Sequence, residues 1–220
     1  MLAKNSFQFF NEDRYLWAVG QIWIDAQRHI LKYGKIVNSE IIETLNYSFS
    51  VKAEKKDDSI LQKWAKLENI KEMRKVFHTS LPNKFGHNYH KKMIGPITGD
   101  PIDSITKILS KDSTTKRAVI TMIGSSKGDV PCLNVIQFLI REENLYVNYF
   151  ARGQDIFNKF YADVICVLDI AEEVKNRLNK TEIYVSGTIG SAHIYLENIA
   201  DSESLIKEAD NLIEHGVISQ

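Results

Sequence analysis

The spacing of apolar residues predicts both helices and strands in this chain. Over residues 13–33 the apolar side chains recur at helical spacing, and Gly34 is placed to cap the C-terminus of that helix. Residues 43–53 alternate between apolar and polar positions, which is typical of a strand. Residues 61–77 return to helical spacing. Helical and strand patterns therefore mix from the start of the chain.

The rest of the chain continues this mixture. The patterns predict helices over residues 103–110, 155–178 and 202–215, and strands over residues 116–123, 134–141, 145–150 and 182–188. Residues 142–144 would join two of these strands as a hairpin, and Asp155 is a suitable N-cap for the longest helix. Because the elements do not alternate as regular strand–helix–strand units, we expect one α+β domain spanning residues 1–220.

Composition and charge set only broad limits. The 220 residues include 28 basic and 28 acidic side chains, so attraction of nucleic acid by bulk charge is not expected. No apolar stretch approaches the roughly 18 residues of a membrane span, and acidic residues interrupt the N-terminal segment where a signal peptide is apolar. Two cysteines in apolar surroundings predict a reducing, cytoplasmic setting rather than a disulfide framework.

Asp163 is the most informative polar residue in the predicted long helix. It belongs to a stripe at helical spacing whose other members are apolar: Ile156, Phe160, Val167, Ile170 and Val174. A carboxylate on an apolar helix face needs a partner or a proton. Asp163 is therefore either half of a buried ion pair or capping contact, or a carboxyl group directed at a polar ligand.

Other polar residues allow two interpretations each. Cys132 begins a strongly apolar strand, where a buried packing cysteine is more common than a nucleophile, and reactivity would need a cationic neighbour. Lys116, Arg117 and Arg152 are either solvated strand ends or phosphate ligands. The second cysteine, Cys166, is expected in the helix core.

Four blocks of the sequence resemble motifs of the thymidylate synthase family, in the same order. Residues 131–157 (PCLNVIQFLIREENLYVNYFARGQDIF) are similar to the strand with the nucleophilic cysteine, the next strand and the phosphate-binding R-S-x-D-x-F motif. Residues 190–195 (GSAHIY) are similar to G-D-x-H-x-Y, residues 102–122 to the I-D-Q-I…S-R-R segment, and residues 85–90 to Y-G-x-x-W/L. The resemblance implies the family's fold, a mixed sheet with flanking helices that dimerises through the sheet.

The resemblance also implies roles for individual residues. Cys132 takes the place of the nucleophile that adds to C6 of a pyrimidine nucleoside monophosphate, so that C5 attacks the one-carbon unit of 5,10-methylenetetrahydrofolate. Arg152 takes the place of the arginine that binds the 5′-phosphate and favours the thiolate. The same match implies that Lys116 and Arg117 bind the phosphate of the nucleotide held by the partner chain. It also implies that His193 and Tyr195 contact the sugar, and that Gln137 and Asp155 line the pocket. A homodimer that shares these residues is therefore expected.

The departures from the family pattern point to the substrate. Asp163 stands where thymidylate synthases have a uracil-reading asparagine, and the family's cytosine-nucleotide hydroxymethylases have aspartate there. A carboxyl group accepts from the cytosine amino group and, when protonated, donates to N3. Gly153 replaces a serine and Lys116 replaces an arginine, as in the family's ribonucleotide branch. These residues favour CMP over dCMP, with chance variation as the alternative for the last two.

The expected product follows from two motifs that the sequence lacks. Neither the family's arginine-bearing N-terminal phosphate loop nor its C-terminal tail is recognisable, and a more open site favours water addition, which gives a hydroxymethyl group. Glu68 and Glu72 are candidates for the general base, although for either one taken singly a solvated helix residue is the more common interpretation. The hypothesis is a CMP C5-hydroxymethylase of nucleoside antibiotic or antimetabolite biosynthesis. Its alternatives are a minimal thymidylate synthase or C5-methylase, and an inactive nucleotide-binding protein of the same fold.

Overall fold

The computed structural model describes residues 18–52, 58–82, 88–97, 99–122, 124 and 130–216. The strands are β1 (Lys35–Val37), β2 (Ile41–Lys52), β3 (Met93–Ile94), β4 (Val119–Met122), β5 (Leu133–Arg141), β6 (Asn144–Asp155) and β7 (Ile183–Tyr195). The helices are α1 (Val19–Tyr33), α2 (Ser59–Trp64), α3 (Leu67–His78), α4 (Pro101–Lys111), α5 (Phe160–Arg177) and α6 (Ile199–Glu214), with 3₁₀ turns η2 (His90–Lys92) and η3 (Leu196–Asn198).

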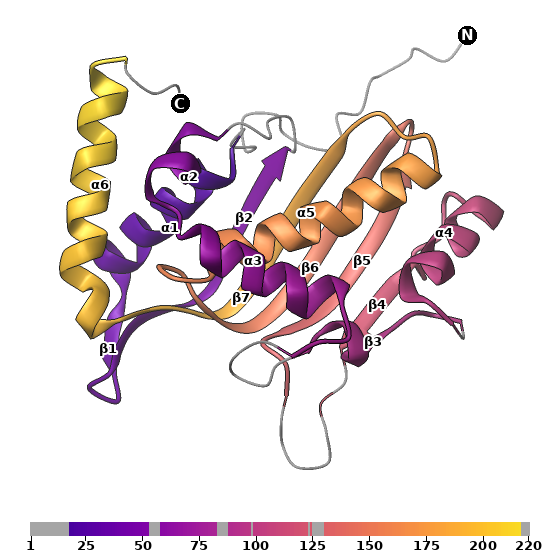
Figure 1. The fold of residues 1–220 in the computed structure, drawn as a ribbon, viewed down its shortest axis with the longest axis horizontal. Helices are drawn as coiled ribbons and strands as arrows, with labels where there is room; N and C mark the ends of the chain where they lie inside the picture. The colour runs from indigo at the N-terminus through magenta and orange to yellow at the C-terminus, as the bar shows by residue number, and fades with distance from the viewer. Residues whose placement is uncertain are drawn as a thin grey trace, which may run out of the picture.

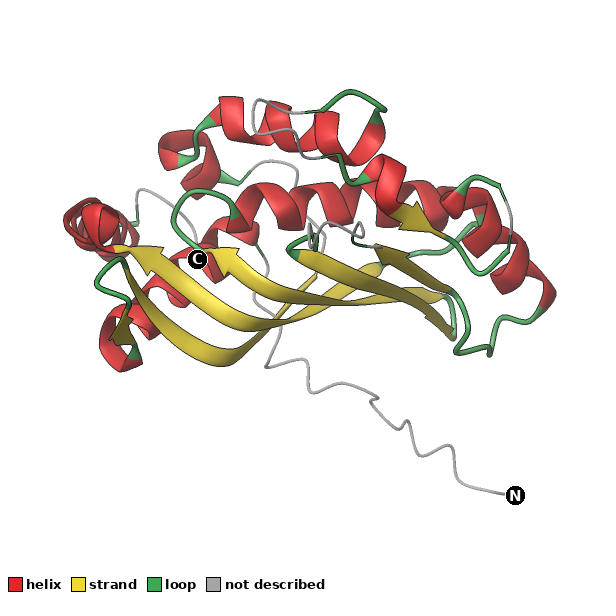
Figure 2. Ribbon diagram, turned by 90° about the horizontal axis from the view of Figure 1, so that it is seen from below, coloured by secondary structure: helices red, strands yellow, loops and turns green. Residues whose placement is uncertain are grey.

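The described strands form one seven-stranded sheet in the order β1-β2-β7-β6-β5-β4-β3. Neighbouring strands are antiparallel except β6 and β7, which are parallel and joined through α5. Helices α1, α3 and α5 lie over the same face, and α6 stands at the edge of the molecule beside α1 (Figure 1). The opposite face of the central strands carries no helix among the described residues (Figure 2).

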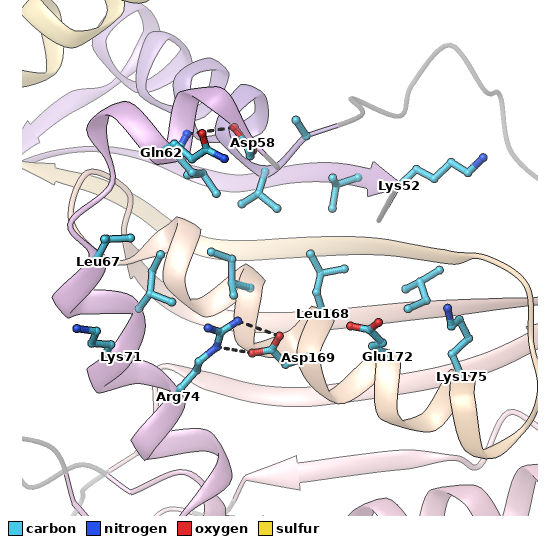
Figure 3. A pocket seen from close by; sticks show the side chains of 17 residues that line it. Lys52, Asp58, Gln62, Leu67, Lys71, Arg74, Leu168, Asp169, Glu172 and Lys175 are labelled. Atoms are coloured by element: carbon cyan, nitrogen blue, oxygen red, sulfur yellow. Dashed lines mark hydrogen bonds and ion pairs between the residues drawn. The ribbon is translucent and has the colours of Figure 1, made fainter. Parts of the chain in front are cut away.

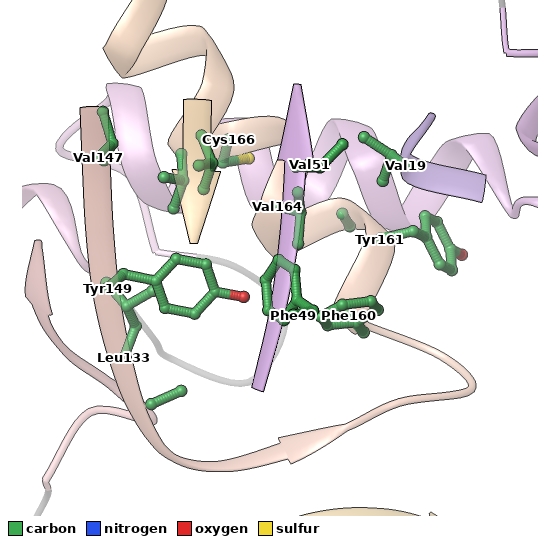
Figure 4. Close-up of a cluster of buried hydrophobic side chains, with 14 of the residues drawn as sticks. Val19, Phe49, Val51, Leu133, Val147, Tyr149, Phe160, Tyr161, Val164 and Cys166 are labelled. Atoms are coloured by element: carbon green, nitrogen blue, oxygen red, sulfur yellow. The ribbon is translucent and has the colours of Figure 1, made fainter. Parts of the chain in front are cut away.

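The core lies between the sheet and α5. Aromatic rings interlock there: the Phe49 ring packs edge-on against Phe160 and Tyr149, with centroid distances of 4.9 and 5.6 Å (Figure 4). Trp23 of α1 contacts the Tyr161 ring and donates from Nε1 to the Ile156 carbonyl oxygen at 2.8 Å. Burying each such large side chain contributes about 1.5–3 kcal/mol, so α1 and α5 are held firmly against the sheet.

Several local predictions are confirmed. The strand over residues 43–53 is part of β2, the hairpin is formed by β5 and β6, and helices occur near residues 103–110 and 202–215. Gly34 caps α1, donating its N–H to the Ile30 carbonyl oxygen. The apolar stripe of the long helix is buried throughout, Asp163 included. Residues 13–17 of the first predicted helix lie outside the described residues.

The prediction of one helix over residues 61–77 is wrong. Helix α2 ends at Trp64 and α3 begins at Leu67, with Ala65 and Lys66 both in extended conformation. The Lys66 N–H donates to the Tyr161 hydroxyl at 3.1 Å instead of to a helix carbonyl. A tertiary hydrogen bond has therefore interrupted a sequence with helical periodicity.

The prediction that Asp155 caps the long helix is also wrong. Asp155 is the last residue of β6, and Lys159 precedes α5. The Asp155 carboxylate accepts from the Asn158 backbone N–H at 3.0 Å and from Asn158 Nδ2 at 3.1 Å. Asp155 therefore stabilises the turn between strand and helix rather than the helix itself.

The central strands change which side faces the core part-way along their length. On β6 the buried residues have odd numbers up to Ala151 and even numbers from Gln154. On β7 the same change occurs between Ile189 and Ala192, which are the register partners of Ala151 and Gln154. This change of buried face brings Gln154 toward α5.

Among the described helices, none has the length and hydropathy that crossing a bilayer requires.

Candidate functional site

Cys132 and Arg152 lie side by side at the start of β5. The Arg152 backbone N–H donates to the Cys132 carbonyl oxygen at 2.8 Å. The Arg152 guanidinium extends along the residues before the cysteine: Nε donates to the Val130 and Pro131 carbonyl oxygens at 3.2 Å, and Nη2 donates to Val130 at 2.9 Å. Cys132 is a half-buried free thiol. The Arg152 guanidinium therefore lies along the residues that directly precede this thiol.

Arg152 keeps donors available for an anion. A guanidinium has five N–H groups, and the contacts with Val130 and Pro131 use only Nε and one N–H of Nη2. The other N–H groups have no partner within the described residues, and the side chain is exposed. Asn134 fixes this arrangement, because its Oδ1 accepts from the Arg152 backbone and its Nδ2 donates to Pro131. The geometry suits bidentate binding of a phosphate.

Asp163 and Gln154 form a buried hydrogen-bonded pair between α5 and β6. Gln154 Nε2 donates to Asp163 Oδ2 at 2.8 Å, and the two residues are only 3% and 5% exposed. Burial raises the pKa of Asp163 to about 7, although the Gln154 hydrogen bond and the Lys159 charge act in the opposite direction. The prediction that Asp163 lies on the buried helix face is confirmed. Gln154 was not predicted as a site residue, because its partner is nine positions away on another element.

Two tyrosines lie around the same cysteine. Burial raises the pKa of the Tyr89 hydroxyl, and negative charge on Asp163 and on Cys132 raises it further. Burial also raises the pKa of Tyr195, with smaller effects of nearby charges that include Asp155 and Cys132. Tyr89 follows residues 85–87, which lie outside the described residues, and the motif resemblance there did not single it out. We call the group formed by Cys132, Arg152, Gln154, Asp163, Tyr89 and Tyr195 the Cys132 site.

His193 lies on β7 beside Tyr195, because this strand continues to Tyr195, beyond the predicted residues 182–188. The two rings are perpendicular with centroids 5.6 Å apart, and His193 Nδ1 is 3.2 Å from the Ser191 carbonyl oxygen. The Ser191 hydroxyl donates to a carboxylate oxygen of Glu43 on β2. Glu43 and Ser191 are polar residues of this sheet region that the sequence analysis missed, because strands β2 and β7 meet only in the fold.

Gly153 leaves room for a side chain. It is the register partner of Ser191, and an added Cβ would lie 3.7 Å from the Ser191 carbonyl oxygen and 3.9 Å from the Ser191 Cβ. Both distances are ordinary van der Waals contacts, so the backbone does not require glycine. The space beside Arg152 is therefore larger than a serine at this position would leave.

The other predicted binding residues lie in a separate group. Gln137 Nε2 donates to the Lys116 carbonyl oxygen at 3.0 Å, and Asn148 Nδ2 donates to Gln137 Oε1 at 3.5 Å. Lys116 and Arg117 are exposed just before β4. In the part of the chain that the structure describes, no hydrogen bond or ion pair joins this group to the Cys132 site. One chain by itself does not bring the two groups together.

The candidate general bases gain no support from their positions. Glu68 is exposed in the first turn of α3, and Glu72 forms an ion pair with Lys75 at 3.0 Å. Glu68 therefore has the surroundings of a solvated helix residue, whereas Glu72 is half-buried and already ion-paired. We assign the base to neither of them.

Two other features of the surface are distinct from the Cys132 site. A cavity of about 830 Å³ lies between α2, α3 and α5 (Figure 3), and Cys132 does not line it. His78, Cys166 and Asp169 place three ligand-type atoms within 4.8 Å of one another. Arg74, however, donates to both Asp169 oxygens at 2.7 and 3.2 Å, and burial raises the pKa of Cys166 well above its ordinary value. We therefore assign no metal to this group.

Comparison with solved structures identifies the fold. The structure matches thermostable thymidylate synthase A from Bacillus subtilis with a TM-score of 0.67 and 12% sequence identity, covering 85% of this chain and 83% of that chain. The chain has the thymidylate synthase fold. The α+β architecture and the mixed sheet with flanking helices that the motif resemblance implied are both confirmed, whereas the dimer stays a prediction.

Comparison of sequences supports the same relationship. Three proteins that bear the provisional name of thymidylate synthase match at low identity: 26% over 132 residues in Methanocaldococcus jannaschii, 21% over 144 residues in Methanothermobacter marburgensis and 22% over 146 residues in Methanothermobacter thermautotrophicus. These matches cover 54%, 64% and 64% of this chain, and the chain spans only 60%, 65% and 65% of the relatives' lengths. No family model matches the sequence.

Proposed function

We propose that this protein transfers a one-carbon unit from 5,10-methylenetetrahydrofolate to C5 of a pyrimidine nucleoside monophosphate, with Cys132 as the nucleophile. More specifically, we propose that the acceptor is CMP in preference to dCMP and that the product is 5-hydroxymethyl-CMP. The thymidylate synthase fold and the names of the relatives support the reaction class. The buried Asp163 carboxyl, which interacts with the same Tyr89 hydroxyl as Cys132 does, supports the choice of cytosine as the base.

The ionisation of Asp163 is the observation on which the choice of base depends. With its pKa raised to about 7 by burial, Asp163 is largely protonated in mildly acidic solution and can donate to a ring nitrogen. Cytosine presents an acceptor at N3 and a donor at N4, whereas uracil presents a donor at N3 and an acceptor at O4. A neutral carboxyl group at the base edge therefore pairs with cytosine at N3. A site that leaves a buried polar group unpaired discriminates strongly against the wrong base.

Each residue of the Cys132 site would have a separate role in the reaction. The Cys132 thiolate would bond to C6, which moves electron density to C5 and toward N3. Asp163 would supply a proton on the N3 side, and Arg152 would hold the phosphate with the N–H groups that its carbonyl contacts leave over. Tyr195 and His193 would contact the sugar. The open space beside Gly153 would admit a ribose hydroxyl.

The folate would supply the one-carbon unit at the oxidation level of formaldehyde. Near Cys132, the buried polar side-chain atoms that lack a partner within the described residues belong to Tyr149, Gln154 and Asp163. We assign the Asp163 oxygen to the base edge, and we assign no described residue to the folate. Residues 83–87 and 125–129, which precede Tyr89 and Cys132 in the chain, lie outside the description.

A homodimer is part of the proposal. The helix-free face of the central strands carries Phe150, which is 41% exposed, and the stacked rings of Tyr146 and Tyr184, whose centroids are 5.0 Å apart. An aromatic sheet face of this kind is expected to be covered by another surface. A second copy packed there would also give Lys116 and Arg117 a phosphate to bind. Light scattering after size-exclusion chromatography measures the oligomeric state, and a monomer would contradict this part.

Release of tritium from C5-labelled nucleotides tests the reaction. Purified protein would be incubated with labelled CMP, dCMP or dUMP, with and without methylenetetrahydrofolate, and absorbance would report any dihydrofolate. Folate-dependent product formation from CMP without dihydrofolate is the expected result. Absence of release from all three nucleotides would refute an enzymatic role.

Methylation of dUMP is the second candidate, and the names of the relatives favour it. It predicts tritium release from dUMP together with formation of dihydrofolate. The same assay therefore separates the two candidates directly.

A further inference from the structure

The Gln154–Asp163 pair has too few donors if Asp163 is ionised. Gln154 Nε2 donates to Asp163 Oδ2, but Asp163 Oδ1 and Gln154 Oε1 are both buried with no partner within the described residues. An ionised pair thus leaves two acceptors, and the nearby Tyr149 hydroxyl, which is also buried without a partner within the described residues, offers only one donor for them. Buried acceptors of this kind are costly, and native structures leave few of them.

A proton on Asp163 changes this count. Because Oδ2 already accepts from the Gln154 amide, the proton of a neutral Asp163 belongs on Oδ1. That hydroxyl is a donor, and Gln154 Oε1 is the acceptor without a partner in the same pair. A carboxylic acid and an amide can close two hydrogen bonds in this way. Protonation therefore removes the shortage that the ionised pair has.

We propose that Gln154 is a positioning residue: its hydrogen bond to Oδ2 leaves Oδ1 to carry the Asp163 proton, and it stabilises the carboxylate that remains after this proton passes to the nucleotide base. The inference rests on the proposed function, since the base is that of the proposed substrate. In the proposed step, the bond from Cys132 Sγ to C6 forms. The C5=C6 electron pair moves to C4–C5, the C4=N3 pair moves onto N3, and N3 takes the proton from Asp163. Gln154 touches no reacting atom and acts through Asp163.

The surroundings of Asp163 set the direction of the expected change. Burial is the main cause that raises the Asp163 pKa, Asp155 raises it slightly, and the Gln154 hydrogen bond and Lys159 lower it. Three further groups face the carboxyl and have raised pKa values themselves, so they are neutral near pH 7: Tyr89, Tyr149 and Cys166. Removing the Gln154 donor therefore raises the pKa of Asp163 further.

Titration of the Asp163 carboxyl measures this effect without any substrate. The protein would be labelled with ¹³C-aspartate, and the Asp163 signal identified by its loss in Asp163→Asn. Replacing Gln154 by methionine, which has a similar volume and no donor, should raise the Asp163 pKa by about one to two units, the value of a hydrogen bond to a charged group. Gln154→Glu keeps the shape and adds a like charge, so it should raise the pKa as well.

A matched control is available in α1. Gln27 is as buried as Gln154, donates from Nε2 to the Trp23 carbonyl oxygen and accepts from the Ser202 hydroxyl. Gln27→Met removes a buried amide of equal size far from Asp163 in sequence. The pKa of Asp163 in the Gln27→Met variant should equal that in the unmodified protein.

Nucleotide binding links the pair to the reaction. Affinity for CMP should fall tenfold per pH unit above the Asp163 pKa, and in Gln154→Met this fall should begin about one to two pH units later. An unchanged Asp163 pKa in both folded Gln154 variants would overturn the proposal. A raised pKa in both variants, with no nucleotide binding to the unmodified protein at any pH, would support the pairing and refute the proposed function.

Discussion

Replacing Asp163 by asparagine should remove a pH dependence of stability that the unmodified protein has. The pKa of Asp163 is about 7 in the folded protein, against its ordinary value of 3.8. The folded state therefore binds this proton more tightly than the unfolded state, which is the reverse of an ion-paired carboxylate. Between these two values the unfolded state binds fewer protons, so the free energy of unfolding falls as pH rises from about 4 to about 7.

The size of this effect follows from the same shift. At 1.36 kcal/mol per pKa unit, a shift of about three units corresponds to about 4 kcal/mol over the whole interval. Between pH 5 and pH 8 the linkage relation gives a loss of about 2 to 3 kcal/mol from this one group. Because Asp163 is almost completely buried, solvent screening does not reduce the figure greatly. Asparagine keeps an acceptor for the Gln154 amide and cannot ionise.

Urea unfolding at several pH values between 5 and 8 tests the prediction. Tryptophan fluorescence follows the transition, since Trp23 is buried at the junction of α1 and α5. Histidine titration is common to both proteins, so the difference between their free energies of unfolding isolates Asp163. Asp112→Asn is the control: hydrogen bonds from Thr114 lower the pKa of Asp112, so its contribution changes only in more acidic solution. A difference between Asp163→Asn and the unmodified protein that stays constant over this range would refute the buried, neutral carboxyl.

Three further substitutions, and a second measurement on Asp163→Asn, test the proposed chemistry. Cys132→Ala should abolish tritium release while calorimetry still detects nucleotide binding, and retained turnover would exclude covalent addition. Asp163→Asn should increase the affinity for UMP relative to CMP, and an unchanged ratio would remove Asp163 from base recognition. Gly153→Ser fills the space beside Ser191 and should reduce the affinity for CMP about tenfold more than the affinity for dCMP. Equal reductions for both nucleotides would show that Gly153 does not select the sugar. Arg152→Met should reduce the affinity for CMP by about 10- to 100-fold and leave the affinity for cytidine unchanged. Competition binding measures both affinities.

Local periodicity was sufficient for some of the site. The buried stripe of α5 identified Asp163 as a carboxyl group in the core, because helical spacing depends only on neighbours along the chain. The G-D-x-H-x-Y resemblance identified His193 and Tyr195 together, and β7 extends through both of them. The order of the motifs indicated the fold. These signals are either local or shared with a known family.

Contacts between distant segments carried no such signal. Tyr89 meets the Cys132 site from a segment without regular periodicity, and the Ser191–Glu43 hydrogen bond joins two strands that are 148 positions apart. Lys66 shows the same limit in the fold, because a hydrogen bond to Tyr161 interrupts a helix that its own sequence favours. Tertiary contacts override local preference wherever they satisfy a backbone group that the helix would otherwise satisfy.

The change of buried face on β6 decides which residue meets Asp163. Strict alternation from Tyr149 and Ala151 would turn Asp155 toward the core, where it would face Asp163 as a second carboxylate. Instead Arg152 and Gly153 both lie outside the core, so Gln154 faces α5 and Asp155 closes the turn. An amide that can donate therefore replaces a like charge beside the buried carboxyl. The same two residues place the Arg152 guanidinium beside the segment that precedes Cys132, so one irregularity in the strand positions both the proposed phosphate ligand and the partner of the proposed acid.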